Sequence, residues 1–212
     1  MSGFAENCGM FPFMVESIRR TCFRAAPIGV IEPCQDGWTV EHLDWSNPSN
    51  QQRRRVLSPS SGWRFLQGLG VRQGRLIGGC LEVLDWLRGT SAWPDPSAFD
   101  HAILFLETSE GAPPPQAVAH TLRSYASMGI LRRLSGILFG RPGGGVPVDD
   151  FSKYDDAIFQ VVAEEEGLSE LPVVTRMDFG HTDPMFVLPY GVLAQIDCNN
   201  RRFEILENAV VD

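Results

Sequence analysis

The stretch Ile103–Glu107, with the sequence ILFLE, decides the fold class of this chain. Its four consecutive large apolar residues predict a strand that is buried on both faces, because a strand with one solvent-exposed face alternates apolar and polar residues. Such strands lie in the middle of the sheets of α/β domains, which place their chemistry at the strand ends. Glu107, at the end of the run, is therefore either a polar rim residue or part of a site.

Further strands and helices are expected on both sides of this central strand. Short apolar runs predict strands at Trp63–Leu66, Gly74–Gly78, Leu134–Phe139 and Pro172–Val174. Helical spacing of apolar residues predicts helices at Leu81–Arg88, Ala117–Met128 and Tyr154–Glu165. A hairpin is predicted near the end of the chain, with strands at Val192–Asp197 and Arg202–Leu206. The order mixes strands with helices and finishes with β-structure.

Before residue 63 the sequence predicts little regular structure. Phe11–Cys22 predicts a helix, and Ile28–Ile31 predicts a short strand. Residues 32–62 are polar and show little periodicity, which predicts a long, exposed and mobile loop. The basic run Arg53–Arg55 within this loop is expected to be solvated.

Size and charge exclude several classes of protein. The chain has 212 residues, a formal net charge of −8 and 43% hydrophobic residues, which fits one large domain or one domain with an appendage. The acidic balance predicts no nucleic-acid partner, because binding of phosphates needs a basic excess. No run approaches the roughly 18 apolar residues that span a bilayer, so no membrane partner is expected. The five cysteines lack a Cys-x-x-Cys spacing, which argues against a zinc site and favours a reducing cytoplasm.

One histidine stands in an unusual local context. His181 lies within Asp178–Met185, with the sequence DFGHTDPM, between a predicted strand and a second apolar run. A histidine between Gly180 and Thr182, with Pro184 close behind, is expected on a bent and rigid backbone, where a general base is typically held. Many histidines are merely structural, so the residues alone leave both interpretations open. The chain contains no Gly-x-Ser-x-Gly elbow that would supply a serine nucleophile.

Other candidate positions also keep two interpretations. Gly78 and Gly79 indicate either a close backbone approach to a ligand or a tight turn. Cys80 opens a predicted helix, which is expected to lower its pKa, but no histidine lies nearby in sequence and a cysteine nucleophile is not favoured. Arg141 is either a ligand for a substrate carboxylate or, as we expect, a member of a surface ion pair. His42, His101 and His120 are expected to be structural, and no spacing supports a metal site.

Four stretches together resemble the C-terminal domain of the LD-carboxypeptidase family of serine peptidases, above all its microcin C immunity branch. They are Gly74–Gly79, Ile103–Glu107, Gly136–Arg141 and Phe179–Met185, the last followed by Leu188–Gly191. Their order and spacing agree with the family over most of the chain. The resemblance implies a three-layer β/β/α swivelling domain with a mixed sheet at residues 63–212. Residues 1–62, with the N-terminal helix and long loop, then form the end of a missing N-terminal domain and its linker.

The resemblance also implies a Ser-His-Glu catalytic unit in which Glu107 orients His181 and His181 acts as the base. The serine belongs to the N-terminal α/β domain of the family, so this chain alone is expected to be inactive. The implied substrate has an amide bond next to a free carboxylate, in a murein L,D-peptide or in a microcin C-like peptidyl or aminoacyl nucleotide. Gly78, Gly79 and Cys80 would contact substrate. No cofactor is implied, and a homodimer is expected.

Two departures from the family bear on specificity. Cys80 stands where family members often have asparagine, and Thr108–Gly111 replaces a segment that contains a lysine in some members. The alternative to an enzyme fragment is a non-catalytic module that binds a ligand or forms a dimer. If a partner domain is missing, an exposed apolar surface is expected near the start of the chain, made by Phe4, Phe11, Phe13 and Met14.

Overall fold

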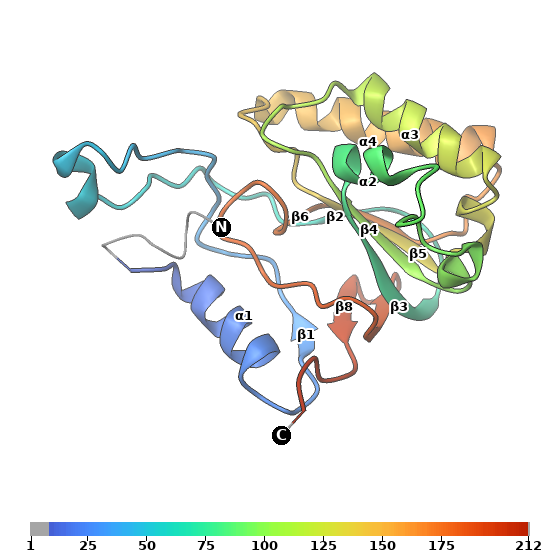
Figure 1. Cartoon of the computed structure of the whole chain (residues 1–212), viewed down its shortest axis with the longest axis horizontal. Coiled ribbons are helices and arrows are strands. Elements are labelled where there is room, and N and C mark those ends of the chain that lie inside the picture. Colours follow the sequence, from blue (N-terminus) through green and yellow to red (C-terminus); the bar gives the residue numbers. More distant parts are fainter. Residues whose placement is uncertain (1–8, 212) are drawn as a thin grey trace.

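A computed structural model describes residues 9–211 as an α/β structure built around one mixed sheet (Figure 1). The helices are α1 (Pro12–Cys22), α2 (Leu81–Leu87), α3 (Pro115–Ser127) and α4 (Phe151–Phe159), and α4 continues into a π-helical segment, Gln160–Glu165. The strands are β1 (Gly29–Ile31), β2 (Arg64–Gln67), β3 (Val71–Cys80), β4 (Ile103–Glu107), β5 (Gly136–Gly140), β6 (Val173–Met177), β7 (Leu193–Asp197) and β8 (Arg202–Ile205). The predicted elements are therefore present, with bounds that differ by a few residues.

The sheet has the strand order β1-β8-β7-β3-β4-β5-β6-β2. Strands β3, β4, β5 and β6 are parallel, whereas β7, β8, β1 and β2 each pair antiparallel with their neighbours. The long strand β3 joins the two halves, because residues 71–75 pair with β7 and residues 76–80 pair with β4. Because β3 pairs with different neighbours along its two parts, the antiparallel strands can form a layer separate from the parallel strands.

Two hydrophobic cores separate three layers. Leu104 and Leu106 of β4 pack with Leu122 and Tyr125 of α3, on the face that α2, α3 and α4 cover (Figure 1). The alternate residues Ile103 and Phe105 belong to a second core.

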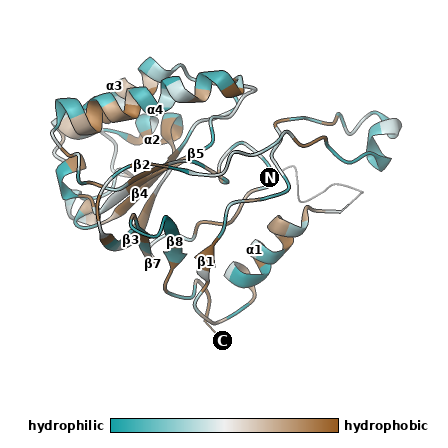
Figure 2. Ribbon diagram, turned by 180° about the vertical axis from the view of Figure 1, so that it is seen from behind, coloured by the Kyte–Doolittle hydropathy of each residue, from teal (hydrophilic) through white to brown (hydrophobic). Residues whose placement is uncertain are grey.

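That second core includes Phe203 and Ile205 of β8, so the antiparallel strands form the layer opposite the helices. All five residues of β4 are buried, and Figure 2 shows hydrophobic strands beneath helices with hydrophilic outer faces. The predicted three-layer β/β/α arrangement with a mixed sheet is confirmed.

The first part of the chain is more integrated than its composition predicts. β1 pairs with β8 at the edge of the sheet, so residues 29–31 are part of it. Phe11 and Met14 are buried, and Phe13 is half-buried, so the predicted apolar surface is wrong for these residues. Phe4 lies outside the described residues. Met14 lies on the buried face of α1 with Ser17 and Thr21, and the guanidinium groups of Arg54 and Arg55 lie over the ring of Phe11.

The loop over residues 32–62 is only partly as predicted. A short 3₁₀ helix, Pro48–Gln52, lies in a segment that projects from the body of the molecule, and its residues are not buried (Figure 1). Trp38, Leu43 and Arg55 are buried, so the prediction of an exposed loop is wrong for them. Arg55 is buried because it pairs with Asp183, and the predicted solvation of the whole basic run is therefore also wrong.

Candidate active site

The candidate site lies where the parallel strands end. In the pairing of β3 with β4, Cys80 is opposite Glu107, so both occupy the carboxyl edge of the sheet. Arg141 follows β5 directly, and the segment with His181 follows β6. Since parallel strands point the same way, four chain segments that are far apart in sequence meet at one edge, which is where open α/β sheets bind ligands.

Glu107 and His181 are in direct contact. Nδ1 of His181 lies 2.7 Å from Oε2 of Glu107, although the two residues are 74 positions apart. Glu107 is buried, whereas the His181 side chain is 39% exposed. A carboxylate at this distance favours a proton on Nδ1, which is the tautomer that a general base acting through Nε2 needs. The predicted proximity of the two side chains is confirmed by this distance.

Two glycines allow this contact by leaving room for Glu107, a role that the sequence did not show. Gly180 has φ +98°, and a Cβ atom there would lie 2.7 Å from Cβ of Glu107 and 2.9 Å from its Oε2. A Cβ atom on Gly140 would lie 2.6 Å from the carbonyl oxygen of Phe179 and 3.0 Å from Cβ of Glu107. Both positions need a residue without a side chain, because the loop with His181 passes directly over Glu107.

A second carboxylate reaches the other side of the imidazole ring. Oε2 of Glu110 lies 3.0 Å from Nε2 of His181, and the Glu110 side chain is 80% exposed. The preceding residue is fixed in place, because Ser109 donates its hydroxyl to Glu82 Oε1 at 2.5 Å. Glu110 therefore occupies the direction from which a nucleophile would approach His181, and sequence reasoning missed it because an exposed loop glutamate carries no distinctive signal.

The two glycines at the end of β3 differ in their surroundings. A Cβ atom on Gly78, which has φ +155°, would lie 1.7 Å from the carbonyl oxygen of Phe105, so this glycine is needed for the approach of β3 to β4. Its amide N–H donates to the Tyr190 hydroxyl at 3.2 Å. At Gly79 the nearest atom to such a Cβ is the same hydroxyl, 3.7 Å away, so space remains beside it.

Cys80 does not have the reactivity expected of a residue at a helix start. Burial raises the pKa of its thiol to about 11, so the predicted lowering of this pKa is wrong. Removal from solvent is the largest cause, and the carboxylates of Glu107 and Glu82 raise the pKa further. The short helix α2 does not offset these effects, and the thiol stays protonated at neutral pH.

A cleft of about 610 Å³ opens beside His181. Its lining combines the loops after β4 and β6 with the segment before β2. The lining residues are Thr39, Val40, Glu41, His42, Arg55, Glu110, Gly180, His181, Asp183 and Met185. A volume of this order fits the size of small-molecule sites. His42, expected to be structural, therefore borders the cleft, whereas His101 and His120 are exposed and lie outside its lining.

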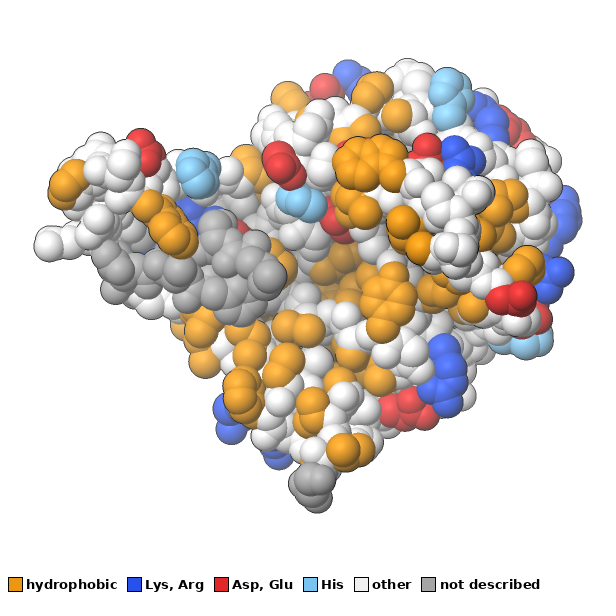
Figure 3. All heavy atoms as spheres, in the orientation of Figure 1, with side chains coloured by type: hydrophobic (Ala, Val, Ile, Leu, Met, Phe, Trp, Pro, Cys, Tyr) orange, Lys and Arg blue, Asp and Glu red, His pale blue; other side chains and the backbone are white. Residues whose placement is uncertain are grey.

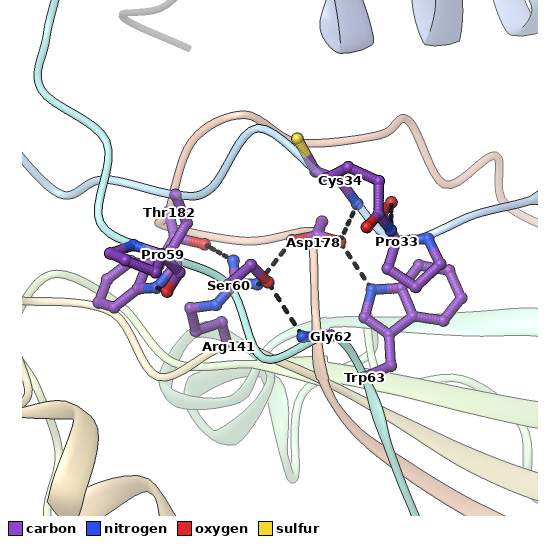
Figure 4. Close-up of polar contacts among 11 residues, drawn as sticks. Pro33, Cys34, Pro59, Ser60, Gly62, Trp63, Arg141, Asp178 and Thr182 are labelled. Atoms are coloured by element: carbon purple, nitrogen blue, oxygen red, sulfur yellow. Dashed lines mark hydrogen bonds and ion pairs between the residues drawn. The ribbon is translucent and has the colours of Figure 1, made fainter.

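The loop with His181 is anchored by a buried polar network. Asp178 is completely buried and accepts a bond from Arg141 at 2.6 Å (Figure 4). Arg141 does form an ion pair, but a buried one, so the prediction of a surface pair is wrong. The partner of Arg141 lies 37 positions away, which explains why local sequence did not show its burial.

Among residues 9–211, no three or more His, Cys, Asp or Glu side chains are grouped to hold a metal ion. Within the same residues, no helix has the length and apolar character needed to cross a membrane.

Comparison with known proteins identifies a matching family. Residues 73–196, more than half of the chain, match the LD-carboxypeptidase C-terminal domain. The chain is 27% identical over 176 residues to the microcin C7 self-immunity protein MccF of Escherichia coli, an alignment that covers 80% of this chain and 46% of that protein.

Solved structures give the same result. An MccF-like protein from Streptococcus pneumoniae, crystallised in complex with AMP, superposes with a TM-score of 0.70 at 27% identity, covering 84% of this chain and 52% of that one. An MccF-like protein from Bacillus anthracis shares the fold, with a TM-score of 0.66 at 24% identity over 84% of this chain and 51% of its own. The chain thus spans about half the length of the relatives it matches.

Proposed function

The chain belongs to the LD-carboxypeptidase C-terminal domain family, and we propose that it supplies the acid and the base of a serine-type carboxypeptidase. The observation that carries the proposal is the 2.7 Å contact between His181 Nδ1 and Glu107 Oε2 at the carboxyl edge of the sheet. A buried carboxylate that orients a half-exposed imidazole is the arrangement that a general base requires. The serine nucleophile comes from an N-terminal α/β domain that is not part of these 212 residues.

The proposed reaction uses His181 twice. Nε2 of His181 takes the proton of the serine hydroxyl as the serine oxygen attacks the carbonyl carbon, and backbone amides stabilise the oxyanion. His181 then gives that proton to the leaving amine as the amide bond breaks, which leaves an acyl-enzyme. Water attacks the acyl-enzyme by the same route and restores the serine. Glu107 accepts the Nδ1–H bond throughout and stabilises the imidazolium.

The proposed substrate class is an amide next to a free carboxylate, as in a murein L,D-peptide or a peptidyl or aminoacyl nucleotide. The relatives support this class: one is a microcin C7 self-immunity protein, and another was crystallised with AMP. Gly79 and Cys80 border the site, and the space beside Gly79 suits close approach of a substrate. Cys80 and the absence of lysine from Thr108–Gly111 indicate that substrate contacts differ from those of other members. The proposed chemistry uses no cofactor.

The surface beside the site suits the docking of a second domain. Val83 and Trp86 of α2 are exposed, and so is Tyr190, whose hydroxyl accepts from the amide of Gly78. Figure 3, in the orientation of Figure 1, shows hydrophobic side chains gathered around a hollow in the middle of the face on which α2 is seen. Large exposed apolar groups of this kind mark interfaces. We assign this surface to the serine-bearing domain; a homodimer stays a prediction.

A second candidate function is a non-catalytic binding module, and one observation favours it. Glu110 occupies the space at His181 Nε2 that a serine hydroxyl would need. The enzyme proposal requires Glu110 to turn away when the nucleophile domain docks. Its 80% exposure leaves room for that movement.

The test is complementation. The chain is mixed with the separately produced N-terminal domain of the Escherichia coli relative, and association is measured by light scattering. Release of amino acid from an L,D-tetrapeptide and from an aminoacyl sulfamoyl adenosine is then assayed. We expect turnover of at least one substrate only when both parts are present, and its loss in His181→Ala but not in the exposed control His120→Ala. Association without turnover would favour the binding module.

A further inference from the structure

Two buried ion pairs flank His181 in sequence and in space. Arg141 Nη2 lies 2.6 Å from Oδ1 of Asp178, three residues before the histidine, and these side chains are 3% and 0% exposed. Arg55 Nη1 lies 2.7 Å from Oδ2 of Asp183, two residues after the histidine, and these side chains are 5% and 9% exposed. A buried ion pair therefore anchors each end of the short loop that carries His181.

The first pair also binds the segment that precedes β2. Oδ2 of Asp178 accepts from the amide N–H of Cys34 at 3.0 Å and from Nε1 of Trp63 at 2.7 Å. Figure 4 shows Cys34, Trp63 and Arg141 converging on Asp178. The carboxylate thus receives three donors from three separate parts of the chain, which satisfies a charge that would otherwise be costly to bury.

Arg141 itself reaches further into the same segment. Its guanidinium lies 5.2 Å from the centre of the Trp38 ring and 3.5 Å from the Ser60 hydroxyl. It also contacts the hydroxyl of Thr182, the neighbour of His181, at 3.4 Å. A planar guanidinium with several donors is suited to such a junction, and a lysine is not.

The second pair is reinforced by the backbone. The amide of Thr39 donates to the carbonyl of Asp183 at 2.6 Å, and the amide of Asp183 donates to the carbonyl of Thr39 at 2.9 Å. Together with Arg55, these bonds hold the far end of the His181 loop against residues 38–58. We call residues 34–63 the clamp.

We infer that Arg141 and Arg55 are positioning residues for His181, and that they act by fixing the His181 loop to the clamp. The inference rests on the proposed role of His181 as base. Between the two anchored ends, Gly180 has φ +98° and passes directly over Glu107, so the orientation of the imidazole depends on where those ends are held. Supporting contacts of this kind keep catalytic groups within the narrow range that proton transfer needs.

Stability alone does not account for two buried ion pairs. Replacement of such a pair by apolar residues of similar volume is often neutral or stabilising, because burying two charges is costly. An ion pair does, however, fix the direction of the groups it joins. The placement of both pairs on the two ends of one six-residue segment, Asp178–Asp183, points to the orientation of His181.

The test measures which nitrogen of the His181 ring carries the proton. The ¹⁵N shifts of the ring are recorded on the whole chain at a pH where the imidazole is neutral. All variants carry Glu110→Ala, because the Glu110 carboxylate 3.0 Å from Nε2 would itself favour a proton there. With Glu110 removed, the otherwise native chain should show the proton mainly on Nδ1, facing Glu107. Arg141→Met should lose that preference and approach the mixture found in free histidine, while Arg141→Lys should keep part of it. Trp63→Phe removes one hydrogen-bond donor to Asp178 and should reduce the preference for the Nδ1 proton by less. This variant is used if Arg141→Met does not fold.

Leu122→Ala is the control, since it weakens the core on the helix side without touching the His181 loop. It should lower the urea midpoint and leave the ring shifts unchanged. The inference is overturned if Arg141→Met and Trp63→Phe also leave the ring shifts unchanged, or if Leu122→Ala alters them as much. This readout needs no substrate or nucleophile, so a failed complementation would refute the proposed function and not this inference.

Discussion

The carboxylate of Glu110 lies 3.0 Å from Nε2 of His181, on the opposite side of the ring from Glu107. The imidazole is thus bracketed by two carboxylates, one buried and one exposed. The inner one suits a permanent orienting role. The Glu110 carboxylate occupies Nε2, the nitrogen that must accept the proton of the serine hydroxyl. We expect this competition to lower the catalytic rate.

Replacement of Glu110 by glutamine should therefore raise the activity of the complemented enzyme, defined as this chain with the serine-bearing domain. An exposed pair contributes little, so the expected gain in kcat/KM is up to about fivefold. Glu164→Gln, at another exposed glutamate, is the control and should change nothing. A loss of activity in Glu110→Gln would instead make Glu110 a contributor to catalysis.

Replacement of Asp178 by asparagine should strongly destabilise the chain. The change leaves Arg141 buried without its countercharge, and breaking a buried pair in this way costs about 3–5 kcal/mol. Urea unfolding would measure the loss. Asp100→Asn breaks an exposed pair with Arg133 and should cost no more than about 1 kcal/mol. Equal effects of the two substitutions would contradict the structural role given to the buried pair.

Alkylation of Cys80 should be slow and strongly dependent on pH. Its pKa is raised from 9.0 to about 11, so at pH 8 its thiolate population is about 100-fold below that of an unperturbed thiol. The rate with iodoacetamide should rise as pH increases until about 11, and mass spectrometry of peptides would follow it. The exposed Cys22 is an internal comparison. Labelling of Cys80 at pH 8 as fast as Cys22 would show that its thiol is accessible and easily ionised.

Alanine at position 180 should disrupt the site itself. The new Cβ atom would lie 2.7 Å from Cβ of Glu107, which is a collision. The alanine would also have to adopt a left-handed backbone conformation, with φ +98°. Strain of the backbone alone costs about 1–3 kcal/mol. Gly145→Ala is a matched control, because Gly145 has φ +74° with no atom near its Cβ position. Urea unfolding and the ¹⁵N shifts of the His181 ring would measure the effect. Equal losses of stability in the two variants, with the Nδ1 proton of His181 kept in both, would contradict a role for the close packing of Gly180 over Glu107.

Much of the fold was predictable because its signals are local. The continuous apolar run of β4 indicated a strand buried on both faces, and the cores on its two faces confirm it. The apolar run of β4 is thus a signal carried by a few neighbouring residues. That Glu107 and His181 belong to one site was implied by the resemblance to the family and not by local sequence, and the structure brings the two side chains together.

Features that depend on distant partners were not predictable. Arg55 and Asp183 are 128 positions apart, so a polar segment with an arginine run gave no sign of a buried pair. The same holds for Gly140 and Gly180, whose need for a missing side chain arises only when the His181 loop crosses Glu107. The pKa of Cys80 was mispredicted because its burial, which sequence does not show, outweighs the effect of a short helix.

The most direct test of the central claim is the turnover of the complemented enzyme with Glu107→Gln. A glutamine keeps the shape of the side chain but removes the charge that orients and stabilises the imidazolium. We predict a fall in kcat of about 10⁴-fold with little change in KM, as expected when the orienting acid of a serine triad is neutralised. A kcat within a few-fold of the native value would contradict the assignment of Glu107 and His181 as an acid–base pair.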